Sequence, residues 1–240
     1  MKIKLLAIAF TALSMQATAL FAQSLPDSMQ YAAAPAIFQY ELDNQYEIFN
    51  GQEYIEPYAY QGSTFFMNNN QMAMGTVVYN DHTYTNVQLN YDAYIDGLLG
   101  FNQLLHGRFV LKPHKVARFE LRGHRFINIT PALNNSIKSG YYEELYGGTT
   151  TLLAKRIKTR RDQLAIEGVL PIYEDKTELF LLKNNVYQKV KSKGDVVKVL
   201  KDQQEKVNSF IKLKGLKFND DRERSIALVA AYYDQISTAQ

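Results

Sequence analysis

Side chains that could hold a metal or catalyse a reaction are few and scattered in this 240-residue chain. There is no cysteine, which excludes disulfides, thiolate metal sites and cysteine nucleophiles. The histidines are His82, His106, His114 and His124. None of their spacings is the i,i+2 or i,i+4 spacing of paired ligands on a strand or a helix. We therefore predict that the histidines lie in exposed loops and that the chain uses no metal and no cofactor.

Carboxylates offer the best pair for acid–base chemistry or for Ca²⁺ binding. Asp92 and Asp96 both follow a predicted strand, but Asp96 precedes a glycine, and turn stabilisation is the expected role of both. Glu143 and Glu144 alternate across another predicted strand, so at most one faces a cleft, and pairing with a basic strand is expected. Motifs for a serine nucleophile or a phosphate loop do not occur. The sequence therefore favours a protein that is not an enzyme.

Basic side chains form the remaining candidate site. Five of the seven residues 155–161 are basic, and lysines alternate along residues 189–193. One interpretation is a solvated strand edge whose charges discourage aggregation. The other is a surface for an anionic partner, such as a membrane or an acidic polysaccharide; nucleic acid is not expected, because the acidic content is ordinary. The candidate residues are Lys155, Arg156, Lys158, Arg160, Arg161, Lys189, Lys191 and Lys193.

The net charge of +3 conceals a marked asymmetry along the chain. Residues 24–107 carry nine acidic side chains and no Lys or Arg, whereas residues 108–240 have a net charge of +10. Two alternatives follow: the two parts pack together and neutralise each other, or the basic part presents a face to an anionic partner.

The first 23 residues have the pattern of a secretory signal peptide. Two lysines precede an apolar run, and small residues follow it, with cleavage predicted after Ala19, Ala22 or Gln23. No later apolar run approaches the length of a membrane helix. We therefore predict an exported protein, in the periplasm, associated with the outer membrane or secreted. We predict that residues 24–41 form an extended leader, 42–193 a β-rich body, and 194–240 a helical segment packed on the same domain.

Hairpin signals recur through the body. Apolar and aromatic residues alternate on both sides of turn-forming pairs, of which Asn80-Asp81 is the first clear example. The spacing from Tyr84 to Val87 breaks the period of two and predicts a bulge at Thr85-Asn86. Further turns are expected at 96–97, 106–107, 122–123, 147–148 and 184–185. We also predict an earlier hairpin around 50–51, a short strand at 64–67 and a surface excursion over 159–176.

The periodicity changes to 3.6 near residue 194, which predicts two or three short amphipathic helices. Capping signals are expected at Asp195, Asp202 and Asp220, and Gly215 is expected to end a helix. Strands followed by helices indicate an α+β fold: a mostly antiparallel β-meander or partial barrel with C-terminal helices.

Several motifs follow one another in the chain: Gly75-x-Val-x-Tyr79-Asn-Asp-x-x-Tyr84-x-x-Val87-x-Leu89-x-Tyr91-Asp92, Gly140-Tyr-Tyr-Glu-x-Leu-Tyr146-x-Gly148, Leu152-Leu153-x-Lys155, and the ending from Val190-Lys-Ser-Lys193 to Tyr232-Tyr233-Asp234. In their order they resemble a family of small exported envelope proteins of Bacteroidetes that have no assigned function. The resemblance implies a signal peptide, a β-rich body and C-terminal helices, and it transfers no catalytic residues.

These observations favour a non-catalytic binding or interaction protein of the cell envelope. A curled aromatic sheet covered by helices could carry an apolar ligand, an expectation that rests on fold analogy alone. The alternative is a structural accessory of an outer-membrane or surface assembly that contacts an anionic partner. A hydrolase comes third.

Overall fold

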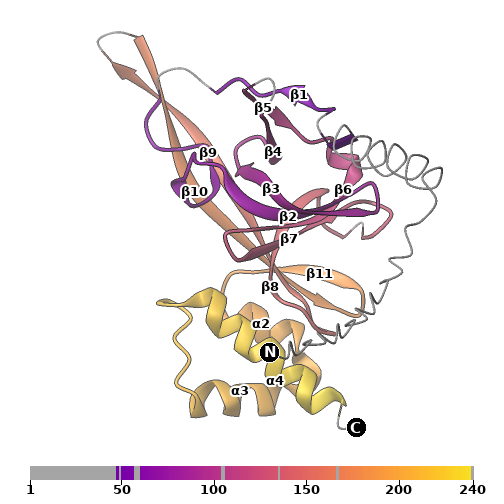
Figure 1. The fold of residues 1–240 in the computed structure, drawn as a ribbon. Coiled ribbons are helices and arrows are strands. Elements are labelled where there is room, and N and C mark those ends of the chain that lie inside the picture. Colours follow the sequence, from indigo (N-terminus) through magenta and orange to yellow (C-terminus); the bar gives the residue numbers. More distant parts are fainter. Residues whose placement is uncertain are drawn as a thin grey trace, which may run out of the picture. The chain divides into compact units, whose positions relative to one another are not determined.

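One open sheet of eleven antiparallel strands forms most of the structure, and the helices follow it at the C-terminus (Figure 1). This computed structural model describes residues 47–48, 50–56, 60–103, 106–134, 136–165 and 168–238. All of them lie in one unit, Gln45–Gln240. The predicted signal peptide and leader fall outside the described residues. The strands are β1 Gln52–Glu53, β2 Ala73–Tyr79, β3 His82–Asp92, β4 Gly97–Asn102, β5 Gly107–Val110, β6 Val116–Leu121, β7 His124–Ile129, β8 Gly140–Tyr146, β9 Leu152–Ala165, β10 Gly168–Lys183 and β11 Val186–Val190.

The strand order is β1-β5-β4-β3-β2-β6-β7-β8-β9-β10-β11. Strands β2 to β5 form one meander and β6 to β11 another, and the two meet where β6 pairs with β2. The sheet is therefore an antiparallel meander interrupted once, with β1 added beside β5. It does not close, because β1 and β11 remain its two edges.

The predicted turns are confirmed at the residues that tolerate a positive φ. Asn80 and Asp81, with φ of 49° and 65°, join β2 to β3, and Asn184 and Asn185 join β10 to β11 in the same way. The predicted bulge is also present: the β2–β3 register shifts opposite Thr85-Asn86. Asp96, His106 and Arg122 also have positive φ at three of the other predicted turns, whereas Gly147 and Gly148 join β8 to β9 without it.

Three local predictions are wrong. The surface excursion predicted over 159–176 is instead part of the long β9–β10 hairpin. The outer part of this hairpin is exposed and has no buried apolar face, so the sequence shows no strand pattern there. The strand predicted over 64–67 is a single bridge at Phe65 followed by the 3-10 helix η1, Phe66–Asn68. Glu47 and Ile48 are helical, so the first predicted hairpin does not form there, and β1 pairs with the distant β5.

The aromatic core shows that the sheet is strongly curved. Tyr91 on β3 and Tyr141 on β8 are four strand spacings apart in the sheet, about 19 Å if it were flat. Their ring centroids are nevertheless only 6.0 Å apart. Phe119 and Phe126 stack between them at 4.6 Å, and Phe66 packs edge-on against Phe126. The curvature thus wraps the middle strands around a filled aromatic core.

The helices pack on the strands that come last in the chain. Leu152, Leu179 and Leu181 of the sheet share a buried cluster with Val196, Val207 and Ile226 of the helices. No helix of the described residues is long and apolar enough to cross a membrane. The helices are α2 Lys193–Val199, the 3-10 helix η3 Lys201–Gln203, α3 Gln204–Leu213 and α4 Arg222–Thr238; η2, Pro113–Lys115, precedes β6.

Helix caps follow the expected chemistry at shifted residues. Ser192 caps α2 in a capping box in which Asp195 is the third helical residue rather than the cap. The box expected at Asp202 does not form, because α3 begins at Gln204 without a side-chain cap. The Asp221 carboxylate accepts from the Arg224 N–H at the start of α4. Gly215, with φ of 59°, follows α3 as predicted.

Buried tyrosines should make the fold sensitive to alkali. Burial raises the pKa of Tyr142 from 10.0 to about 12, and burial followed by the Asp96 charge raises the pKa of Tyr91 and Tyr141. The folded state keeps these phenols neutral, so their contribution to stability is complete below the unfolded pKa of about 10 and is lost as the pH rises through the folded values. We expect the free energy of unfolding to fall above about pH 10. Urea titrations at several pH values measure it; phenol ionisation, followed by ultraviolet absorbance, without loss of stability would contradict this expectation.

Candidate anion-binding hollow

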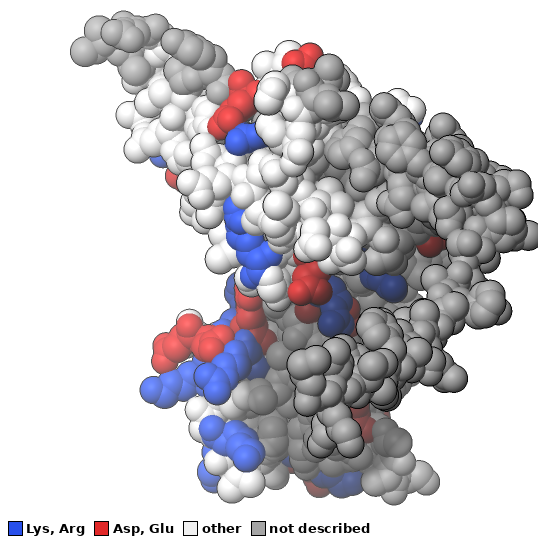
Figure 2. All heavy atoms as spheres, in the orientation of Figure 1, with Lys and Arg blue, Asp and Glu red and all other residues white. Residues whose placement is uncertain are grey.

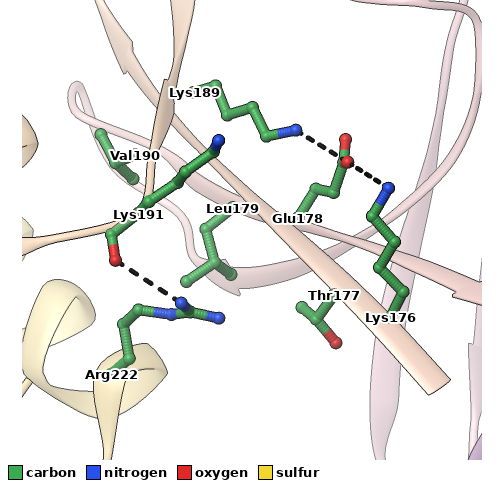
Figure 3. A pocket seen from close by; sticks show the side chains of 8 residues that line it. All are labelled: Lys176, Thr177, Glu178, Leu179, Lys189, Val190, Lys191 and Arg222. Carbon is green, nitrogen blue, oxygen red and sulfur yellow. Dashed lines mark hydrogen bonds and ion pairs between the residues drawn. The ribbon is translucent and has the colours of Figure 1, made fainter. Parts of the chain in front are cut away.

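A hollow of about 270 Å³ opens where β10, β11 and the start of α4 meet (Figure 3). We call it the basic hollow, because four cations and one carboxylate line it. Its charged residues are Lys176 and Glu178 from β10, Lys189 from β11, Lys191 directly after β11, and Arg222, the first residue of α4; Thr177, Leu179 and Val190 complete the lining.

Strand pairing brings these residues together. The Asn184-Asn185 turn sets a register in which Leu179 lies opposite Val190, and these two point into the helix-covered core. Successive side chains alternate between the faces of a strand. Their charged neighbours Glu178, Lys189 and Lys191 therefore share the other face. Packing of α4 on the core then brings Arg222 to the rim of the hollow.

One carboxylate serves two of the four cations. Glu178 accepts from Lys189 at 2.7 Å and from Lys176 at 2.9 Å, and in Figure 3 these lysines reach it from opposite sides. Their hydrogen bonds hold the pKa of Glu178 below its ordinary value of 4.5, so this group is ionised at neutral pH. The hollow therefore carries four positive charges and one negative charge.

The other two cations have no carboxylate partner within the described part of the chain. Lys191 forms no side-chain ion pair there, and among the described residues the Arg222 side chain forms one hydrogen bond, a 3.5 Å contact with the Lys191 carbonyl oxygen. The Arg222 Nε atom is buried and without a hydrogen-bond partner in the structure. A buried donor left unpaired costs about 1–3 kcal/mol.

The structure places the predicted basic residues in different surroundings rather than on one surface. Lys155, Arg156 and Lys158 do not form an exposed basic surface, because their side chains are only 14%, 17% and 1% exposed and all three pair with carboxylates. Arg160 and Arg161 are exposed on the outer part of the β9–β10 hairpin, paired with Asp162 and Glu174. Of the alternating lysines, Lys189 and Lys191 line the hollow, whereas Lys193 begins α2 and does not.

Lys155 forms a partly buried ion pair with Asp96. Its Nζ atom lies 2.6 Å from Asp96 and 4.8 Å from the centre of the Tyr142 ring. Burial lowers the pKa of Lys155, although Asp96 opposes that shift. Asp96 also accepts from the Tyr91 hydroxyl. A Cβ on Gly140 would lie 2.1 Å from the Asp96 carboxylate, so only glycine leaves room for this ion pair.

Arg156 is the centre of a second inward network. Its Nε donates to Glu143 at 2.6 Å, and its two terminal nitrogens donate to both oxygens of Glu223 on α4. Glu143 in turn lies 2.5 Å from His124. The prediction that the glutamate pair would meet a basic strand is therefore confirmed, and the network ties α4 to β7, β8 and β9.

The candidate catalytic residues do not share a site. Asp92 is buried and accepts from the N–H groups of Tyr94 and Ile95, the turn role predicted for it, and from the Tyr54 hydroxyl. His82, His106 and His114 are exposed, as expected, but His124 is half-buried against Glu143. Among the described residues, no group of three histidine or carboxylate side chains could hold a metal ion.

Two cations of the hollow, Lys176 and Arg222, are not in the predicted set. Lys176 lies in the segment for which the sequence predicts a surface excursion, and Arg222 lies where the sequence predicts only the start of a helix. The turn at 184–185 contained the missing signal, because counting outward from it places Glu178 opposite Lys191. Nothing in the sequence places Arg222, which depends on how α4 packs.

The charge asymmetry is partly neutralised inside the fold. Glu47, Glu56 and Asp96 from the acidic part pair with Lys115, Arg108 and Lys155 from the basic part. Figure 2 shows Lys and Arg beside Asp and Glu on the visible face rather than as one extended basic area. Internal pairing therefore accounts for part of the asymmetry, and the hollow is a local exception.

Comparison with protein families, curated proteins and solved structures finds no match to this chain. The function is therefore argued from the geometry of the described residues.

Proposed function

We propose that the chain is an exported, non-catalytic binding protein of the cell envelope that holds an anionic group of its partner in the basic hollow. The observation that carries this proposal is the pair Lys191 and Arg222, two cations without a carboxylate partner among the described residues, beside two lysines that share Glu178. Carboxylate, phosphate and sulfate groups accept the hydrogen bonds that these side chains donate. Acidic polysaccharides and anionic lipid headgroups both present such groups.

Binding of an apolar ligand has less support. Such a carrier needs an empty apolar space beneath the helices, and the space between α2–α4 and the sheet is filled by buried side chains such as Leu200, Val207 and Val229. The curved middle of the sheet is filled in the same way by aromatic rings. These observations favour the accessory protein over the carrier. A hydrolase has no support from Asp92 and Asp96, whose partners are structural.

Export is proposed from the sequence of the first 23 residues and from the family resemblance. Recovery of the native protein from envelope fractions, with an N-terminus just after Ala19, Ala22 or Gln23, would support it. Recovery of the uncleaved chain in the cytoplasm would contradict it.

Charge reversal at the hollow tests the binding proposal. We expect the double variant Lys191→Glu with Arg222→Glu to weaken binding by about tenfold or more, which corresponds to about 1.4 kcal/mol. The measurement is titration calorimetry with polygalacturonate, and cosedimentation with phosphatidylglycerol vesicles, at several salt concentrations. Glutamate is compatible with the first turn of α4, so the variant should fold.

The matched control reverses two exposed lysines at the end of α3, Lys212→Glu with Lys214→Glu at the C-cap, which changes the net charge equally outside the hollow. We expect this control to bind as the wild type does. Equal weakening in both variants would indicate diffuse electrostatic attraction and contradict specific binding in the hollow. Failure of the wild type to bind either probe would also contradict the proposal.

A further inference from the structure

Lys158 is the most deeply buried cation of the described residues that form ion pairs, with only 1% of its side chain exposed. It lies on β9, directly opposite Asp175 of β10, and its backbone N–H donates to the carbonyl oxygen of Ala93. Its Nζ lies 2.7 Å from the Asp175 carboxylate and also contacts the side-chain oxygen of Asn68. A buried lysine amine is thus held against a carboxamide.

Asn68 is held in position from both sides. Its Nδ2 donates to the second oxygen of Asp175 at 3.0 Å, so one carboxylate bridges the amine of Lys158 and the amide nitrogen of Asn68. Asn68 and the preceding Met67 both have left-handed φ values, 54° and 58°. Such backbone conformations cost about 1–3 kcal/mol and cluster at functional sites.

We propose that Lys158 and Asn68 form an intramolecular isopeptide bond, with Asp175 as the group that transfers protons. In this reaction the Lys158 ammonium gives a proton to the Asp175 carboxylate, and the free amine attacks Cγ of Asn68. The bond between Cγ and Nδ2 then breaks. Asp175 returns the proton to the leaving nitrogen, and the second proton of the amine follows, so that ammonium is released. No oxidant, reductant or further reactant is required.

The surroundings suit these roles. Burial acts to raise the pKa of Asp175, but hydrogen bonds from Lys158 and Asn68 outweigh it and hold the pKa below 3.8, so Asp175 is ionised at neutral pH and its two oxygens face the amine and the carboxamide. Asp175 is 63% exposed, which gives the released ammonia a path to solvent. Lys155 is the natural contrast, because it meets the carboxylate Asp96 and no carboxamide.

A cross-link here would tie two segments that are 90 residues apart in the sequence. Asn68 follows the bridge between Phe65 and β3, whereas Lys158 lies in the long β9–β10 hairpin. In a chain without cysteine, the bond would limit unfolding as a disulfide does in other exported proteins.

Mass spectrometry of the purified full chain tests the proposal. We expect the wild type to be lighter than its sequence by one molecule of ammonia, and a digest to contain one branched peptide that joins residues 68 and 158. Chymotrypsin is the suitable protease, because residues 24–107 contain no Lys or Arg for trypsin. A wild-type chain of full mass with an unmodified Lys158 would overturn the proposal.

The variants separate the roles of the three residues. Asp175→Asn keeps the shape of the side chain but removes proton transfer, so we expect full mass in a folded protein; Asn68→Ala should also have full mass. The control Glu174→Gln changes the neighbouring exposed carboxylate and should keep the ammonia loss. Loss of ammonia that persists in Asn68→Ala would place the reaction elsewhere and overturn the assignment.

Discussion

Replacing Arg156 by methionine should lower the free energy of unfolding by about 3–5 kcal/mol, the cost of removing one partner from a buried charge network. Glu143 is only 5% exposed and would keep His124 alone as a partner, and Glu223 would lose both of its bonds to the sheet. The α4 helix should loosen as well. Urea unfolding followed by circular dichroism measures the stability, and hydrogen exchange of α4 amides measures the loosening.

Two further variants locate the origin of this loss. Glu223→Gln changes the more exposed end of the network and should cost less than Arg156→Met. Adding Glu143→Leu to Arg156→Met removes the buried carboxylate that has lost its arginine partner. This double variant should recover part of the stability, because paired apolar replacements of buried ions are often tolerated. If Arg156→Met were no worse than Glu223→Gln, the buried carboxylate would not be the source of the cost.

Replacing Phe126 by alanine should cost about 3–5 kcal/mol, the usual loss for a large ring removed from a packed core. Phe126 is fully buried, stacks on Phe119, and lies 5.1 Å from the ring of Tyr91 and 5.3 Å from that of Phe66. The cavity would lie at the centre of the curved sheet, where strands on both sides depend on the same ring. Thermal and urea unfolding both measure the effect.

The matched control is Leu213→Ala, an apolar truncation at a site that is 82% exposed. It should change stability by less than about 0.5 kcal/mol. Phe126→Leu keeps most of the volume and should fall between the two. A loss for Phe126→Ala as small as that of the control would mean that the aromatic cluster does not support the curvature.

The turns could be predicted because their chemistry is local. Asn80, Asp81, Asn184 and Asn185 adopt the positive φ that the sequence signal implies. The β9–β10 hairpin could not be predicted in this way, because its outer residues are exposed on both faces and show no apolar alternation.

The burial of the basic run could not be predicted either. Lys155, Arg156 and Lys158 look like surface residues in the sequence, and their partners Asp96, Glu223 and Asn68 are 59, 67 and 90 residues away. Only the curvature of the sheet and the packing of α4 bring these groups together. Two of the four cations of the hollow could be predicted. Lys189 and Lys191 follow from the alternation of side chains along a strand, whereas the position of Arg222 depends on tertiary packing.

The pairing of β6 with β2 has a consequence for how the chain folds. Within each meander, every strand pairs with its neighbour in sequence. The β2–β6 ladder instead pairs residues that are far apart in the sequence, such as Gly75 and Leu121. Non-local pairing closes a longer loop and forms more slowly, so we expect this ladder to limit the folding rate. The two meanders carry opposite net charges, and their attraction should speed the encounter in dilute buffer and lose that effect as salt is added.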